Sequence, residues 1–114
     1  MGNDSGELLQ GTLAILILKA LLVGPDHGYG IARWIETVTD DVLSIEEGSL
    51  YPALRRLGDK GWVTSEWGLS DNNRKARYYT ITPAGRKHVR AEAAVWTRYS
   101  AAILQVLRAA PALA

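Results

Sequence analysis

The 114-residue sequence contains no cysteine. Disulfide bonds, thiolate nucleophiles and cysteine-based zinc sites are therefore excluded. The absence of cysteine is typical of a reducing compartment, and the polar start of the chain has none of the basic residues that begin a signal peptide. We therefore expect a cytoplasmic protein. Its length corresponds to one domain with room for an appended helix.

Groups suited to catalysis or metal binding are also scarce. The only histidines, His27 and His88, are too few and too far apart to suggest a metal site. No phosphate-binding loop, dinucleotide fingerprint or catalytic-triad motif occurs. The pairs Asp40–Asp41 and Glu46–Glu47 could hold a cation, but a solvated acidic loop is the expected reading without converging ligands. We therefore expect neither an enzyme nor a protein with a metal or cofactor.

The longest apolar run, Leu8–Val23, is interrupted by Gln10, Thr12 and Lys19. It falls short of the roughly 18 apolar residues of a membrane span, and we interpret it as a buried helix rather than a membrane segment. Its apolar residues lie on two sides of that helix: Leu13 and Ile17 on one, Leu18 on the other. Such a helix must be covered on more than one side, which favours a second subunit.

The net charge of +1 conceals a strong asymmetry along the chain. Residues 1–54 carry two bases and eight acids, whereas residues 55–90 carry nine bases and three acids. A net charge of +6 concentrated in one segment is typical of a phosphate-binding surface. The alternative is an ordinary solvated surface of mixed charge.

Two helices are predicted in the middle of the chain. The first begins near His27–Gly30 and continues to Val38. The second begins between Glu46 and Ser49, with Ser49 as the expected N-cap, and ends near Gly61. Its leucines, Leu50, Leu54 and Leu57, share one face and must be core, which leaves Arg55 and Arg56 on the opposite, open face.

A β-hairpin follows these helices. The β-branched and aromatic residues of Trp62–Trp67 predict one strand, and Ala76–Thr82 predicts its partner. Between them lies a polar loop of about eight residues, rich in Asn, Asp, Gly and Ser. A short helix followed by a basic hairpin is the arrangement of a winged helix-turn-helix.

A long C-terminal helix is predicted after the hairpin. Thr82 would cap it, and Pro83 would take its first position. Val89, Trp96 and Ile103 recur every seven residues, and Tyr99 and Val106 lie on the neighbouring stripe. Such a helix after a completed domain is usually an association element, the alternative being a helix that folds back on its own domain.

Several stretches of the chain, taken together in order and spacing, resemble the PadR family of transcriptional regulators. They are Leu9–Leu13, His27–Ile31, Gly48–Leu54 with Arg56–Leu57, Lys60–Trp62, Arg77–Tyr79 and Thr82–Gly85. With one C-terminal helix, the chain is similar to the short branch of the family. The resemblance covers nearly the whole chain. It implies a bacterial, homodimeric repressor that binds double-stranded DNA at a palindrome-like operator.

The resemblance also implies how the dimer forms. The C-terminal helices would pack against each other and against the first helix of the partner. The expected interface residues are Leu13, Ile17, Val89, Trp96, Tyr99, Ile103 and Val106. In some short family members a tryptophan at the place of Trp96 stacks on a flat aromatic drug, so Trp96 is either interface packing or the site of a small aromatic ligand.

The residues expected to contact DNA come from the second of the two middle helices and the hairpin. They are Ser49, Tyr51, Arg55, Arg56, Asn72, Asn73, Arg74, Lys75 and Arg77. Some have other readings: the arginines could be merely solvated, and Tyr51 could pack on the preceding helix. Glu46 and Glu47 would repel phosphate unless they point away or accept from a cytosine amine.

The sequence thus predicts a mainly α fold with a small β-hairpin wing. A winged helix-turn-helix domain would span residues 1–82, and a dimerisation helix residues 83–114. The favoured function is a sequence-specific DNA-binding regulator, most simply a repressor released by a small molecule or another signal. The alternatives are a winged-helix module that binds protein, or a drug-binding protein that uses the dimer interface. The basic segment favours DNA, because a protein-docking module does not need it.

Overall fold

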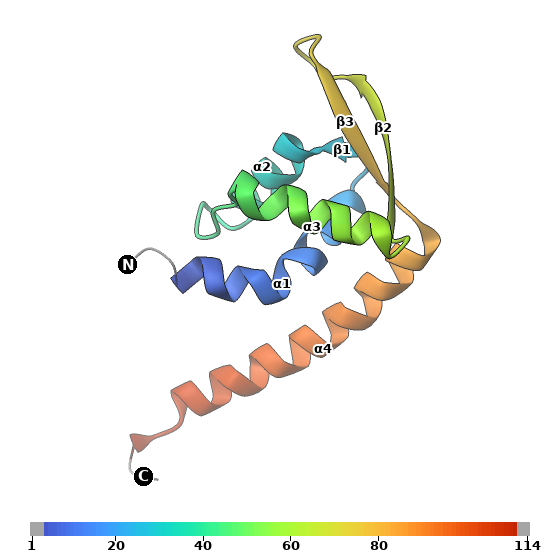
Figure 1. Ribbon diagram of the computed structural model, residues 1–114. Coiled ribbons are helices and arrows are strands. Elements are labelled where there is room, and N and C mark those ends of the chain that lie inside the picture. Colours follow the sequence, from blue (N-terminus) through green and yellow to red (C-terminus); the bar gives the residue numbers. More distant parts are fainter. Residues whose placement is uncertain (1–3, 112–114) are drawn as a thin grey trace.

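The structure, a computed structural model, describes residues 4–111, with side chains from residue 12 onward. Its elements in chain order are α1 (Asp4–Leu21), β1 (Asp26–His27), α2 (Gly28–Val38), α3 (Glu47–Asp59), β2 (Val63–Leu69), β3 (Lys75–Ile81) and α4 (Pro83–Arg108). The first three helices gather together, the β2–β3 hairpin stands beside α3, and α4 runs back past α1 (Figure 1). This is the mainly α fold with a β-hairpin wing that the sequence predicts.

A single apolar core joins the three-helix cluster, the base of the hairpin and the start of α4. Its largest fully buried side chains are Ile17, Leu18, Leu21, Ile31, Leu50, Leu54, Leu57 and Val89. The leucines of α3 are therefore core, as their spacing predicts. With one helix face committed to the core, the opposite face of α3 is left for solvent or a partner.

The chain itself covers the second face of α1 only in part: Ile15 and Leu22 are partly buried, so the expectation that a second subunit covers this face stays a prediction. Leu18, on its second face, is fully buried, because α1 contacts α2, α3, β3 and α4 of its own chain. Leu13, Ile17 and Val89, expected at the dimer interface, are only 3%, 0% and 2% exposed. A side chain already covered by its own chain has no surface left for a partner, so these three residues belong to the core.

The helix α3 begins earlier than its local capping signal suggests. Glu46 is the N-cap without a side-chain hydrogen bond, and Ser49, the expected cap, lies inside the first turn. The preceding segment is held by a hydrogen bond in which the Ile45 amide donates to Glu36 Oε2 at 3.0 Å. This tether and the burial of Leu50 place the helix start, and they outweigh the preference of serine for the cap.

The wing is a hairpin within a three-stranded antiparallel sheet of order β1–β3–β2. Its loop, residues 70–74, is shorter than predicted because the strands extend to Leu69 and Lys75. The extra strand β1 was not predicted: Asp26 pairs with Tyr79 and His27 with Tyr78. His27 also caps α2, since its Nδ1 accepts a hydrogen bond from the Gly30 amide at 3.0 Å.

The helix α4 begins as predicted, with Thr82 as N-cap and Pro83 in the first turn. The Thr82 hydroxyl accepts from the Gly85 amide at 3.1 Å and donates to the Gly61 carbonyl at 2.7 Å, which joins the helix to the base of the wing. From residue 93 to residue 111 every position is exposed, so this part of α4 projects beyond the core (Figure 1). No helix in the described range is long and apolar enough to cross a membrane.

Candidate nucleic-acid interface

The open face of α3 carries two exposed arginines, Arg55 and Arg56. On the helical projection they lie to either side of Pro52. By the helical projection, Arg55 lies on the edge toward the wing, together with Tyr51 and Gly58, and Arg56 lies on the other edge with Ser49. Arg55 and Tyr51 both line a cleft of about 430 Å³ between α3 and the hairpin, and Ser49 and Arg56 do not. The predicted α3 residues therefore divide into a wing-side pair and an outer pair.

One face of the wing looks toward α3. In the β2–β3 register Trp67 pairs with Arg77 and Leu69 with Lys75, so these four side chains lie on the same face, as do Ser65 and Tyr79. We call Ser65, Trp67, Lys75, Arg77 and Tyr79 the inner wing face. Ser65, Arg77 and Tyr79 line the α3–wing cleft opposite Tyr51 and Arg55.

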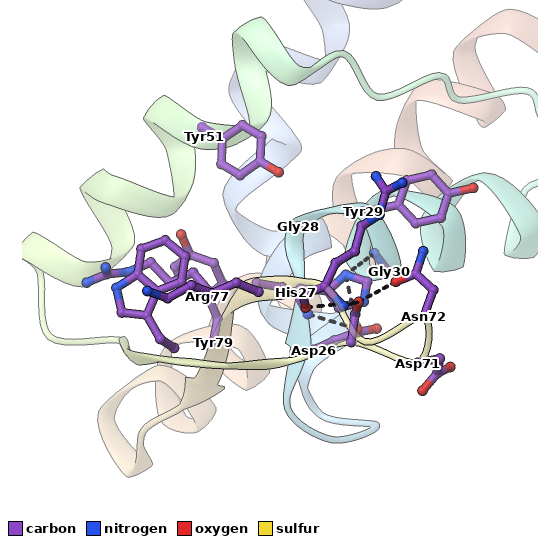
Figure 2. A pocket seen from close by; sticks show the side chains of 15 residues that line it. Asp26, His27, Gly28, Tyr29, Gly30, Tyr51, Asp71, Asn72, Arg77 and Tyr79 are labelled. Carbon is purple, nitrogen blue, oxygen red and sulfur yellow. Dashed lines mark hydrogen bonds and ion pairs between the residues drawn. The ribbon is translucent and has the colours of Figure 1, made fainter.

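A larger cleft of about 890 Å³ lies between the wing and the start of α2 (Figure 2). Among the predicted residues, Tyr51, Asn72, Arg74, Lys75 and Arg77 line it, and β1 and the first turn of α2 form its opposite side. Tyr51 and Arg77 line both clefts. Asn73, with a φ of 64°, belongs to the wing turn and lines neither cleft.

Tyr51 has the packing role that the sequence left as an alternative. Its ring lies against the start of α2, where a Cβ on Gly28 would come within 2.7 Å of Tyr51 Oη. Burial, then the negative charge of Glu47, then Tyr79 raise the pKa of Tyr51 above its ordinary value of 10.0. The hydroxyl therefore stays protonated at neutral pH and can donate a hydrogen bond into either cleft.

Trp67 is not among the residues predicted to contact DNA, yet it lines the larger cleft. It is 58% exposed, and its ring lies under two cations: Lys75 Nζ is 5.2 Å from the ring centroid, and the guanidinium carbon of Arg77 is 5.4 Å from it. The Arg77 Nε–H also donates to Ser65 Oγ at 2.9 Å. In the sequence, Lys75 and Arg77 are two residues apart, so they lie on one face of their strand. Only the register of the hairpin shows that Trp67 lies on the same face.

The lysines and arginines around the clefts form no ion pair with an acid among residues 12–111, although Asp26 and Asp71 line the larger cleft and Asp59 lines the smaller one. Among residues 12–111, one ion pair involves a Lys or Arg side chain. It joins Arg33 to Glu36 on α2, away from the basic segment. Arg55, Arg56, Arg74 and Lys75 are exposed and have no carboxylate partner within this range. An unpaired set of cations on two adjacent elements creates a positive potential suited to phosphate.

The two acidic pairs lie at different places in the fold. Asp40 and Asp41, both with positive φ, make the turn after α2, and Glu46 and Glu47 lie at the start of α3. Among residues 12–111 no group of three His, Cys, Asp or Glu side chains that could hold a metal ion occurs.

A second surface lies on α4. Trp96, Tyr99, Ile103 and Val106 are spaced by three and four residues and are all exposed. We call these four residues the α4 stripe. Exposed apolar side chains at this spacing form the seam of a coiled coil. Leu104 and Leu107 widen the apolar surface beside it.

Comparison with known proteins agrees with this geometry. The profile described as "Transcriptional regulator PadR-like family" matches residues 17–91. A transcriptional regulator of known structure from Clostridium thermocellum is 30% identical, with a TM-score of 0.77 over 87% of this chain and 96% of its own. A PadR family transcriptional regulator from Eggerthella lenta is 31% identical, with a TM-score of 0.72 over 91% of this chain and 88% of its own.

A curated relative extends the comparison. The negative transcriptional regulator PadR of Bacillus subtilis is 26% identical over 77 residues, which are 68% of this chain and 42% of that protein. The present chain thus spans less than half the length of that relative. The profile match covers α2, α3 and the wing, the elements that carry the basic clefts. The chain therefore belongs to the PadR-like family of transcriptional regulators, and it is a bacterial winged-helix regulator rather than an enzyme.

Proposed function

We propose that the protein is a homodimeric repressor in the bacterial cytoplasm that binds a palindrome-like operator in double-stranded DNA. The observation that carries this proposal is the set of unpaired bases on two adjacent elements: Arg55 on α3 and Arg77 on the wing line one cleft, and Arg74 and Lys75 extend the charge along the hairpin. Neither a core nor a protein-docking module requires such a set.

We propose that α3 and the wing contact different parts of the duplex. The open face of α3 suits the major groove, where Arg55 and Arg56 can donate to base edges or phosphates. The wing suits the backbone or the minor groove beside it, with Asn72, Arg74 and Lys75 near its tip. Glu47 at the start of α3 would accept a hydrogen bond from a cytosine amine if its side chain faces the duplex.

Dimerisation is proposed through the α4 stripe. Its four side chains are exposed in the single chain, and an apolar surface of this kind is usually an interaction site. Pairing two such helices side by side would bury the stripe as a coiled-coil seam. A two-fold axis along this pair would present two α3 helices to two half-sites, which accounts for a palindrome-like operator.

The proposal also includes repression of transcription and its release by a signal. Repression is supported by the similarity to the Bacillus subtilis relative, which is a negative transcriptional regulator. Trp96, 41% exposed at the start of the α4 stripe, could stack on a flat aromatic ligand between the paired helices. A ligand releases the operator only if it binds the free dimer more tightly than the DNA-bound dimer.

Selection of bound duplexes from a random pool tests the DNA part. We expect one enriched motif whose two halves are related by two-fold symmetry. Arg74→Ala/Lys75→Ala should weaken binding to the motif and to random DNA about equally, since phosphate contacts carry no sequence information. A matched control removes two bases far from the clefts, Lys19→Ala/Arg108→Ala.

The selection also separates the alternatives. A protein-docking module would enrich no motif, and its affinity for duplex DNA would respond equally to both double variants. The same assay with planar aromatic cations tests release: a compound that acts at Trp96 should lower the affinity of the parent for its motif but not that of Trp96→Ala. Equal release of both proteins would place the ligand elsewhere.

A further inference from the structure

The Arg77 side chain is held at two points by the neighbouring strand. Its Nε–H donates to Ser65 Oγ at 2.9 Å, and its guanidinium carbon lies 5.4 Å from the ring centroid of Trp67. Both contacts come from β2, whose Trp67 is the register partner of Arg77 on β3. A free arginine samples many rotamers, and these two contacts remove much of that freedom before any ligand arrives.

The end of the same side chain has no partner. Among residues 12–111 neither terminal Nη group of Arg77 makes a hydrogen bond within the chain, and no carboxylate pairs with the guanidinium. The residue lines both clefts, with Tyr51 across from it in each (Figure 2). The result is a guanidinium fixed at its base with its two amino groups available for an acceptor.

Lys75 provides an internal comparison. Its ammonium lies over the same ring, 5.2 Å from the centroid, but no residue of the described range 12–111 forms a hydrogen bond with its side chain. Trp67 itself is 58% exposed, so burial does not explain a large aromatic side chain at this position. The ring instead contacts two cations, Lys75 and Arg77. Of these, only Arg77 has a second contact within residues 12–111, the hydrogen bond to Ser65.

We propose that Ser65 and Trp67 are positioning residues that preset Arg77 for a bidentate contact with a backbone phosphate of the operator. This inference rests on the proposed DNA-binding function. A guanidinium fork matches two phosphate oxygens, and its affinity rises when the fork is ordered before binding. The wing then fixes the register of α3 in the groove, because a phosphate contact positions the protein without reading a base.

The test compares affinities for the selected duplex at one salt concentration. Trp67→Ala removes no charge, yet it should weaken binding about three- to tenfold, because Arg77 of each subunit must then be ordered when the duplex binds. Trp67→Phe keeps an aromatic face and should retain most of the affinity. Leu69→Ala is the matched control, since Leu69 is exposed on the same face of β2 and is the register partner of Lys75 rather than of Arg77. Equal affinities of Trp67→Ala and Leu69→Ala would overturn the inference.

A double-mutant cycle shows whether Trp67 acts through Arg77. In an Arg77→Ala background, Trp67→Ala should change the affinity less than about twofold, because coupled residues are not additive. If the full loss persists in that background, Trp67 contacts DNA itself and is not a positioning residue. The salt dependence adds a second criterion: Arg77→Ala should flatten it by about one unit per subunit, and Trp67→Ala should leave it unchanged.

A measurement without DNA separates this inference from the proposed function. In the free protein the Nε–H signal of Arg77 should be shifted by the Trp67 ring and protected from exchange by Ser65. Trp67→Ala should remove the shift, and Ser65→Ala should remove the protection. An Arg77 signal at the position of an unstructured arginine in the parent would overturn the preset geometry, whatever the DNA assays show. Failure of the parent to bind any duplex would instead contradict the proposed function.

Discussion

His88 stacks on Trp62, with the ring centroids 3.7 Å apart and the ring planes inclined by 14°. Trp62 directly precedes β2, and His88 lies in the second turn of α4, so the stack joins the base of the wing to the projecting helix. Lys60 Nζ lies 5.0 Å from the same tryptophan ring. Together with the hydrogen bonds of Thr82, this joint fixes the direction in which α4 leaves the winged domain.

Removing the stack should destabilise the protein. We expect His88→Ala to lower the free energy of unfolding by about 1 kcal/mol, the usual contribution of an aromatic pair. Urea denaturation at one fixed protein concentration measures it, since a dimer makes stability depend on concentration. Lys87→Ala, at the exposed neighbouring position, is the control. Equal stabilities of the two variants would show that the stack contributes nothing.

Two glycine substitutions should have opposite effects. A Cβ at Gly85 would collide with the backbone oxygen of Trp62, which has no room to move, so Gly85→Ala should cost about 2–3 kcal/mol by overpacking. A Cβ at Gly58 in α3 meets nothing within 4 Å, and Gly58→Ala should stabilise the protein by about 0.5–1 kcal/mol through helix propensity. Thermal unfolding of both variants checks the pair; a stable Gly85→Ala protein would refute the close approach of α4 to the wing.

Tyr51 should make stability fall in alkaline solution. The raised pKa of Tyr51 means that the folded protein keeps a phenol proton that the unfolded chain loses near pH 10.0. Where the folded state binds more protons, stability decreases as pH rises, so the loss starts near that pH and continues up to the raised pKa. Unfolding free energies measured on both sides of that pH should fall less steeply for Tyr51→Phe than for the parent. Tyr29→Phe, at an exposed tyrosine, should behave as the parent does.

A charge in the α4 stripe should separate the proposed dimer. Ile103→Glu would bury two unpaired carboxylates at the seam, and we expect the dissociation constant to rise about a hundredfold or more. Sedimentation velocity over a concentration series measures the change. Gln105→Glu adds the same charge on the outward side of the helix and should sediment as the parent does. A parent that is monomeric at all concentrations would rule out the α4 pairing.

Features set by local chemistry could be predicted from the sequence. Thr82 and Pro83 mark the start of α4 because capping and a fixed φ act within one turn. The spacing of Leu50, Leu54 and Leu57 identifies the buried face of α3 for the same reason. The same spacing predicts that Arg55 lies on the open face of α3, and the strand pattern of residues 76–82 predicts that Arg77 lies on the wing; their contact with DNA stays a prediction.

Features set by long-range pairing could not be predicted. The strand β1 has only two residues, too few for a periodic signal, and it exists because Asp26 and His27 pair with β3. The burial of Leu18 depends on how α1 packs against α2, α3, β3 and α4, and no local pattern encodes this packing. The contact of Trp67 with Arg77 depends on the hairpin register, which the loop length sets and the sequence alone left uncertain by a few residues.

The salt dependence of duplex binding tests the central claim most directly. If each subunit engages three to four phosphates, the logarithm of the binding constant should fall with the logarithm of the salt concentration with a slope of about −5 to −7. Fluorescence anisotropy of a labelled operator gives this slope, and Arg74→Ala/Lys75→Ala should flatten it while Lys19→Ala/Arg108→Ala leaves it unchanged. An affinity that does not change between low and moderate salt would contradict the account, because the unpaired bases of α3 and the wing would then not be meeting phosphates.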